Sequence, residues 1–132
     1  MERVRERLGV ARRALDTLGK ALAAPKTELN RDASIQRFEY SFETVWKAAQ
    51  AYLRAVENVQ LASPASVARK SFQTSLLSEE QGQVALRMAE DRNLTAHTYD
   101  EALAEQIYGR LPGYASLMRN WLDAIARNLP PV

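Results

Sequence analysis

Residues 30–58, NRDASIQRFEYSFETVWKAAQAYLRAVEN, carry an apolar side chain at every third or fourth position. This spacing puts the apolar side chains in one stripe along a helix, because an α-helix turns once in about 3.6 residues. Asn30 is the expected N-cap, and the helix would be about 40 Å long, the span of a small bundle. We therefore expect residues 30–58 to be the central helix of the fold. Its stripe is Ile35, Phe38, Phe42, Val45, Ala49, Leu53 and Val56.

Three aromatic residues have two possible roles. Trp46 and Tyr52 flank the stripe of residues 30–58, and Trp121 lies near the C-terminus. They are candidates for an interface with another chain, where large aromatic side chains are enriched. The alternative is that Trp46 and Tyr52 are half-buried residues at the edge of the core.

The chain before the central helix predicts another amphipathic helix. Apolar residues recur through residues 2–23 at alternating spacings of four and three, and Pro25 ends the segment because proline disfavours helical geometry in the residue before it. Its other side is basic, and such a side either contacts RNA or, more often, is simply solvated. The residues of that side are Arg3, Arg5, Arg12, Arg13 and Asp16.

Two helix starts follow the central helix. Ser63 as N-cap and Pro64 at the first helical position predict a short helix to about Leu77. Ser78 and Gln81 have the spacing of a capping box, so another helix should begin near residue 79.

A last apolar stripe runs through residues 103–129, after Asp100 as the expected N-cap. Pro112 and Gly113 lie inside it and should kink or break the helix. The sequence has no strand pattern, so we predict an all-α fold, an antiparallel up-down bundle of four to five helices.

Composition excludes several kinds of chemistry. With 132 residues, 46% hydrophobic and 26% charged, the chain is expected to form one soluble domain, residues 1–132. The absence of cysteine excludes disulfides, zinc–thiolate sites and thiol catalysis, and a single histidine excludes a multi-histidine metal site within one chain. We expect no metal and no cofactor.

Charge and hydropathy give weaker expectations. No apolar run approaches the roughly 20 residues that cross a membrane, and residues 1–7 are not followed by the apolar segment of a secretory signal. We therefore expect no membrane association and a cytoplasmic location. A net charge of +2 is compatible with nucleic-acid binding without favouring it.

The stretch 90–101, EDRNLTAHTYDE, contains the only histidine and is the first candidate for chemistry. If residues 90–98 are helical, Asn93 lies one turn before His97 and could hydrogen-bond its ring. Arg92 lies about 140° around the axis from His97, and a loosened turn after Leu94 would bring them closer. Spacing alone does not establish that these groups meet.

These residue types suit cleavage of a phosphodiester. Histidine exchanges protons near neutral pH, and arginine stays charged and stabilises negative charge on phosphate. Cleavage of RNA through its own 2′-hydroxyl needs no metal but benefits from both an acid and a base. One chain supplies only His97, whereas a two-fold dimer with this stretch at its interface supplies two histidines.

Two other interpretations of the stretch remain open. A lone histidine near a helix end is more often structural, a hydrogen-bonding residue or a favourable charge at the helix dipole. The carboxylates also suggest a magnesium site, although Asp100 is better explained as an N-cap. These carboxylates are Glu90, Asp91, Asp100 and Glu101.

The frame EDRNLTAHTYDE, near the end of a predicted helix in a small all-α chain, resembles the HEPN (higher eukaryotes and prokaryotes nucleotide-binding) superfamily. The similar group is the nucleotidyltransferase substrate-binding proteins, which includes HEPN toxins paired with minimal nucleotidyltransferase (MNT) antitoxins. The resemblance covers almost the whole chain, because residues 31–40 look like the family's second helix and Ser63-Pro64 like its middle.

The resemblance implies a HEPN-type toxin, a metal-independent endoribonuclease that acts as a homodimer. Arg92 and His97 would then be catalytic, and Asn93 and Thr95 would bind or orient RNA or nucleotide. It also implies a partner, a small MNT-type nucleotidyltransferase that modifies the motif's tyrosine with AMP, so that Tyr99 is the matching acceptor. AMP there would add bulk and negative charge beside the site.

Two other functions stay open. In the first, the protein is a non-catalytic subunit that binds substrate or nucleotide for a two-component nucleotidyltransferase, and Arg92 and His97 only hold a nucleotide. In the second, it is a purely structural helical dimer. The sequence differs from the expected pattern between the second and third helices, where Ala65 and Ser66 follow Pro64 in place of a basic residue.

Overall fold

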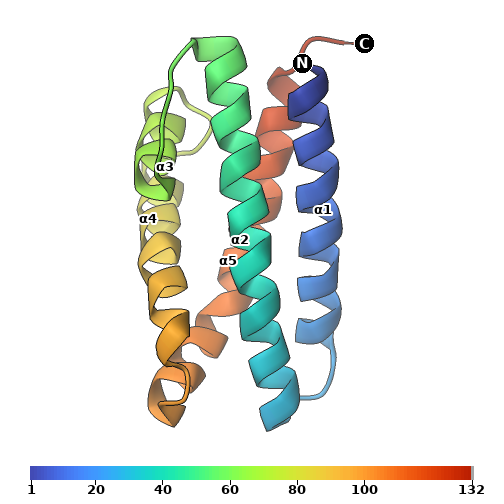
Figure 1. The fold of residues 1–132 in the computed structure, drawn as a ribbon, viewed down its shortest axis with the longest axis vertical. Helices are drawn as coiled ribbons and strands as arrows, with labels where there is room; N and C mark the ends of the chain where they lie inside the picture. The colour runs from blue at the N-terminus through green and yellow to red at the C-terminus, as the bar shows by residue number, and fades with distance from the viewer. Residues whose placement is uncertain (132) are drawn as a thin grey trace.

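The computed structural model describes residues 1–131, which form five α-helices, one 3₁₀ turn and no strand, so the prediction of an all-α bundle is confirmed (Figure 1). None of these helices, over the same residues, is long and apolar enough to cross a membrane. The elements are α1 (Glu2–Ala23), α2 (Glu28–Glu57), α3 (Pro64–Gln73), α4 (Glu79–Leu94), the 3₁₀ turn η1 (Thr95–His97) and α5 (Glu101–Asn128).

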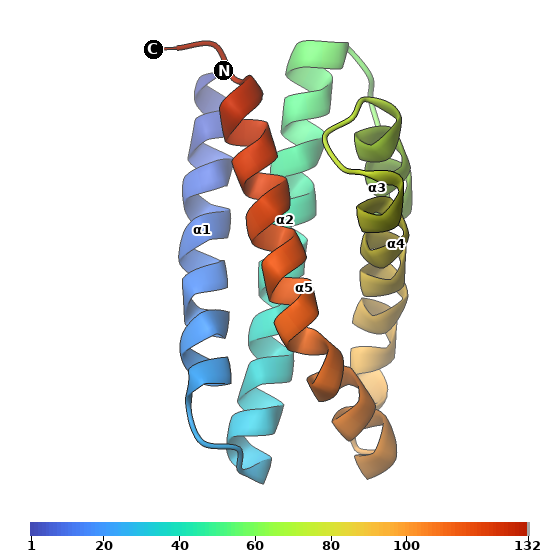
Figure 2. The same cartoon turned by 180° about the vertical axis from the view of Figure 1, so that it is seen from behind.

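Helix α2 is the centre of the bundle, as its apolar stripe predicted. It packs against α1, α5 and α3, and α3 pairs with α4 on the other side of α2 from α1 (Figure 1). Seen from behind, α5 crosses the face that α1 and α2 leave open, and both ends of the described chain lie at one end of the bundle (Figure 2). The opposite end holds the α4–α5 connection.

Helix α2 begins two residues earlier than predicted, and Asn30 is not its cap. Thr27 is the N-cap, because its backbone is extended and its Oγ1 accepts a hydrogen bond from the Asn30 backbone N–H at 3.0 Å. The Asn30 side chain instead donates to the Pro25 carbonyl at 2.6 Å. At the other end Val56 is 41% exposed, so the predicted stripe stops one turn early.

Helix α3 starts at the predicted Ser63–Pro64 signal but ends at Gln73, before the predicted Leu77. Ser75 has a φ of 65°, the left-handed conformation that commonly follows a helix C-terminus. Leu76 and Leu77 both donate backbone N–H bonds to the Ser71 carbonyl and are buried. Their apolar character therefore reflects a buried turn.

Pro112 bends helix α5 without breaking it. Proline has no N–H to donate to the carbonyl four residues earlier and crowds that turn. The helix continues past it to Asn128, and Figure 2 shows α5 changing direction in its first half. The bend lets the start of α5 lie near α4 while its second half packs against α1 and α2.

The three aromatic residues considered for an interface belong to this chain's own core. Trp121 is fully buried and its Nε1 donates to Ser71 Oγ at 3.2 Å. Trp46 and Tyr52 are only 7% and 5% exposed, so the interpretation of all three as surface anchors for a second chain is wrong. They are also more deeply buried than the half-buried edge residues of the alternative.

Candidate functional site

The stretch 90–101 forms the corner between α4 and α5. Helix α4 ends at Leu94 and continues into the 3₁₀ turn η1, so the chain leaves regular α-helical geometry after Leu94, where the sequence suggested a change. Asp100 caps α5 as predicted, because its Oδ1 accepts from the Leu103 N–H at 3.2 Å. The change of helix type ends the regular 100° spacing before His97, so helical angles do not place its ring.

Hydrogen bonds to Asp91 connect this corner to the middle of α5. The carboxylate is buried, with 3% of the residue exposed. Arg110 donates to it from Nε at 2.7 Å and Nη2 at 3.0 Å, and Tyr114 donates from Oη at 2.6 Å. The hydrogen bond to Asp91 raises the pKa of Arg110, and burial followed by the same carboxylate raises the pKa of Tyr114 well above its ordinary value. Near neutral pH the cluster therefore keeps Arg110 charged and Tyr114 neutral.

A second ion pair, between Arg31 and Glu101, connects the start of α5 to α2. Arg31, 5% exposed, donates to Glu101 from Nη1 at 2.6 Å and Nη2 at 3.2 Å. The hydrogen bond from Arg31 lowers the pKa of the Glu101 carboxyl. Arg31 also donates to Asp32 at 3.0 Å. The family-like residues 31–40 thus contribute a structural contact to the corner.

The four carboxylates of the stretch do not gather into a metal site. Two are held by arginines, Asp100 caps α5, and Glu90 lies on α4 away from them. Across residues 1–131 the structure has no group of three or more His, Cys, Asp or Glu side chains placed to hold a metal ion. The described chain therefore gives the magnesium interpretation no cluster of ligands to rest on.

The Arg92 side chain is half-buried, and only some of its N–H groups form hydrogen bonds. Its Nη1 donates to Thr95 Oγ1 at 3.4 Å, and that hydroxyl donates in turn to the Arg92 carbonyl at 2.7 Å. Its Nε is buried and has no hydrogen-bond partner within residues 1–131. An unpaired buried N–H is costly, and Nε is the one buried donor of this guanidinium without a partner in the described chain.

Asn93 contacts a different surface from the one predicted. No hydrogen bond joins Asn93 to His97 in the described chain, because the 3₁₀ turn replaces the α-helical turn that would align them. Asn93 and Arg92 instead line a hollow of about 420 Å³ between α4, α2 and the start of α3, with Trp46 and Ser63 on its other walls.

His97 and Tyr99 form an exposed pair. His97 Nδ1 and Tyr99 Oη are 3.3 Å apart, and the two rings meet edge to face with centroids 5.9 Å apart. Tyr99 is 81% exposed, which leaves its hydroxyl open to a second molecule. The imidazole is exposed as well, and the contact with Tyr99 at the end of η1 also fits a structural hydrogen-bonding role for His97.

The predicted site residues thus fall into two groups within one chain. Arg92, Asn93 and Thr95 lie together on α4 and η1, and His97 and Tyr99 lie together just beyond them. Within residues 1–131 no hydrogen bond links the side chains of the two groups. Sequence reasoning missed the hollow beside Arg92 and the tie from Asp91 to α5, for which the i, i+4 spacing of Arg110 and Tyr114 was the available signal.

Comparisons with known proteins agree with this architecture. A family model described as nucleotidyltransferase substrate binding protein like matches residues 6–127. The chain is also similar to the crystal structure of ttk003001694 from Thermus thermophilus, with 47% identity and a TM-score of 0.85 over 87% of this chain and 98% of that one. No curated protein matches the chain.

Proposed function

Because the chain belongs to the nucleotidyltransferase substrate binding protein like family, we propose that it is a HEPN-type toxin, a metal-independent endoribonuclease that works as a dimer and is neutralised by a small MNT-type nucleotidyltransferase. The observation that carries the proposal is the arrangement of Arg92 and His97. A half-buried guanidinium with an unpaired Nε lies on the same corner as a solvent-exposed imidazole. One group binds phosphate and the other exchanges protons.

The chemistry needs two proton transfers. A base removes the proton of the RNA 2′-hydroxyl, whose oxygen attacks the adjacent phosphorus, and an acid protonates the departing 5′-oxygen, leaving a 2′,3′-cyclic phosphate. His97 of one chain acts as base and the His97 of a second copy acts as acid. Arg92 stabilises the charge that develops on the phosphoryl oxygens. The single domain therefore works as a homodimer, and we expect it to act in the cytoplasm.

The partner transferase would act on Tyr99. The exposed phenol oxygen attacks the α-phosphorus of ATP, the substrate of the transferase, pyrophosphate leaves, and Tyr99 carries AMP through a phosphodiester. The new negative charge then lies close to His97, whose Nδ1 is 3.3 Å from the Tyr99 oxygen. Bulk and charge at that point exclude an RNA phosphate.

The test is cleavage of a mixed RNA in EDTA, with Tyr99 shown to be unmodified by mass. The wild type should leave cyclic-phosphate ends, and His97→Ala should not cleave although it stays folded. Asp100→Asn, which keeps a capping oxygen at an exposed residue of the same corner, is the matched control and should cleave as the wild type does. Equal cleavage by His97→Ala, or none by the wild type, would refute the proposal.

One observation favours the second candidate, a non-catalytic substrate- or nucleotide-binding subunit. The hollow of about 420 Å³ is lined by Arg92 and Asn93 but not by His97. A phosphate bound there would contact an arginine without contacting the histidine, as expected of a binding site that does not catalyse cleavage. This candidate predicts a stable complex with a nucleotidyltransferase, and nucleotide binding that Arg92→Ala weakens, with no cleavage of RNA. Failure to recover such a complex from cells of the source would count against it.

A further inference from the structure

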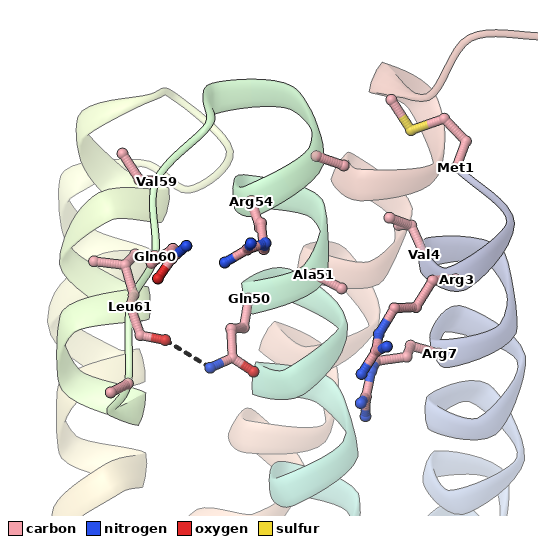
Figure 3. A pocket seen from close by; sticks show the side chains of 12 residues that line it. Met1, Arg3, Val4, Arg7, Gln50, Ala51, Arg54, Val59, Gln60 and Leu61 are labelled. Atoms are coloured by element: carbon pink, nitrogen blue, oxygen red, sulfur yellow. Dashed lines mark hydrogen bonds between the residues drawn. The ribbon is translucent and has the colours of Figure 1, made fainter.

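One hollow that the structure describes lies away from the α4–α5 corner. It has a volume of about 890 Å³ and lies between the first turns of α1, the last turns of α2 and the segment 59–62 (Figure 3). Arg3, Arg7 and Arg54 line it, and its lining contains no carboxylate side chain among residues 1–131. Apolar side chains such as Val4 also line it. A concave surface with three positive charges and no negative one is suited to an anionic ligand.

No carboxylate within residues 1–131 forms an ion pair with these arginines. The salt bridges of the described chain involve other cations, such as Arg31 with Glu101. Figure 3 shows Arg54 beside Gln60, a neutral amide. In the amide orientation that satisfies both groups, Gln60 Oε1 accepts from Arg54 Nη2 at 3.1 Å.

Helix stabilisation explains only part of this cluster. Arg54 lies in the last turn of α2, where a cation interacts favourably with the helix dipole. Arg3 lies in the first turn of α1, where the dipole disfavours a cation. Arg7 follows one turn later, so both guanidinium groups are carried on the same side of α1. The positions of Arg3 and Arg7 are better explained by the binding of an anionic ligand than by a contribution to the stability of α1.

The hollow continues towards the candidate site. Arg3 and Arg7 also line a neighbouring hollow of about 490 Å³, whose other charged residues are Lys47 and the two carboxylates Glu6 and Glu43. Glu43 in turn lines the hollow of about 420 Å³ that contains Arg92. Adjacent hollows therefore share lining residues along α2, and together we call the three hollows the α2 groove. The carboxylate of Glu43 at their junction is offset by Lys47 at 3.5 Å and by the Trp46 N–H at 3.2 Å.

We propose that the α2 groove binds the sugar–phosphate backbone of single-stranded RNA and leads the strand to Arg92. The inference rests on the proposed ribonuclease function and deepens it by naming how the substrate is held. Glu43 to Arg54 is eleven residues, about 16 Å of helix, which is longer than one nucleotide needs. No aromatic side chain of the described chain lines the two hollows nearest Arg54, so backbone contacts outweigh base stacking and binding is expected to be independent of sequence.

The experiment measures binding of a labelled single-stranded RNA by fluorescence anisotropy in EDTA, over a range of salt concentrations. The His97→Ala protein is the background, so that the strand stays intact. Alanine at Arg3, Arg7 and Arg54 should weaken binding about tenfold at low salt, and the slope of log affinity against log salt should become shallower by about 0.7 for each phosphate that the variant no longer binds.

The control removes the same charge elsewhere. Alanine at Arg69, Arg119 and Arg127 deletes three exposed arginines from helices without touching the α2 groove. This variant should keep most of the affinity and the slope. The result for the triple groove variant can be interpreted only if its circular dichroism spectrum and Tm match those of the control. Glu43→Gln therefore provides a second test in case the triple variant does not fold. Removing that carboxylate should tighten RNA binding.

The outcomes separate this inference from the proposed function. Equal affinity and slope for the groove and control variants would overturn the α2 groove, even if the wild type cleaves RNA. Loss of affinity in the groove variant alone would support it, even if the wild type proves unable to cleave. Binding of ATP at a single site, with no binding of RNA, would also overturn it, since the occupant would then be a nucleotide.

Discussion

Replacing Asp91 by asparagine tests whether the corner is held by one buried charge cluster. Asparagine is nearly the same size as aspartate, so packing changes little. The new side chain would keep one acceptor oxygen and turn an NH₂ group towards Arg110 or Tyr114, which are themselves donors to this position. The charge of Arg110 would lose its partner, and at least one donor would be left without an acceptor.

The structure sets the size of the effect. Breaking a fully buried ion pair costs about 3–5 kcal/mol. Here the Arg110 side chain is 35% exposed, so water can solvate part of the freed guanidinium, and we expect a loss of about 2–3 kcal/mol. For a chain of this size that corresponds to a fall in Tm of about 6–10 °C. Thermal unfolding followed by circular dichroism at pH 7 measures it directly.

Asp100→Asn is the matched control, because it makes the same chemical change at an exposed position and keeps an oxygen that can cap α5. Its effect should stay within about 0.5 kcal/mol, as for surface substitutions in general. The reasoning would be refuted if Asp91→Asn melted within about 2 °C of Asp100→Asn, since the buried cluster would then contribute no more than a surface charge.

Three further predictions concern neighbouring groups. Tyr114→Phe removes the 2.6 Å bond to Asp91 and should cost about 1–2 kcal/mol in a denaturant titration. Arg31 lowers the pKa of Glu101 below 4.5, so the pair stabilises the fold above that pH and loses this contribution as pH falls through the lowered value. The Tm advantage of the wild type over Glu101→Gln should therefore be present at pH 7 and disappear as the pH falls below the lowered pKa of Glu101. Tyr99→Phe should unfold as the wild type does, yet gain no AMP mass when incubated with the transferase and ATP.

The helices were predictable because their signals are local. Repeats of three and four residues mark the buried faces, and Ser63, Ser78 and Asp100 cap the helices that their spacing predicts. The start of α2 was predicted wrongly because two neighbouring residues could each cap the helix. Thr27 and Asn30 are both good caps, and the choice between them depends on the path of the chain after Pro25.

The geometry of the candidate site could not be predicted from the sequence. The sequence located Arg92 and His97 on one corner, but their separation depends on the switch from α-helix to 3₁₀ helix, which residue spacing does not encode. The α2 groove was equally hidden, because Arg7 and Arg54 are 47 positions apart in the sequence and only the packing of α1 on α2 brings them to one hollow.

The α4–α5 corner has a rigid part around Asp91 and an exposed part at His97 and Tyr99, which suits a site whose activity is regulated. Asp91 is fixed by Arg110 and Tyr114, and Arg92, which we propose binds phosphate, follows it on the same helix. His97 and Tyr99 are exposed and hydrogen-bonded to each other. A transferase can therefore reach Tyr99 without unfolding the corner, and a group added there interferes with the imidazole rather than with the fold. If this division is correct, AMP on Tyr99 should abolish cleavage while leaving the Tm of the protein unchanged.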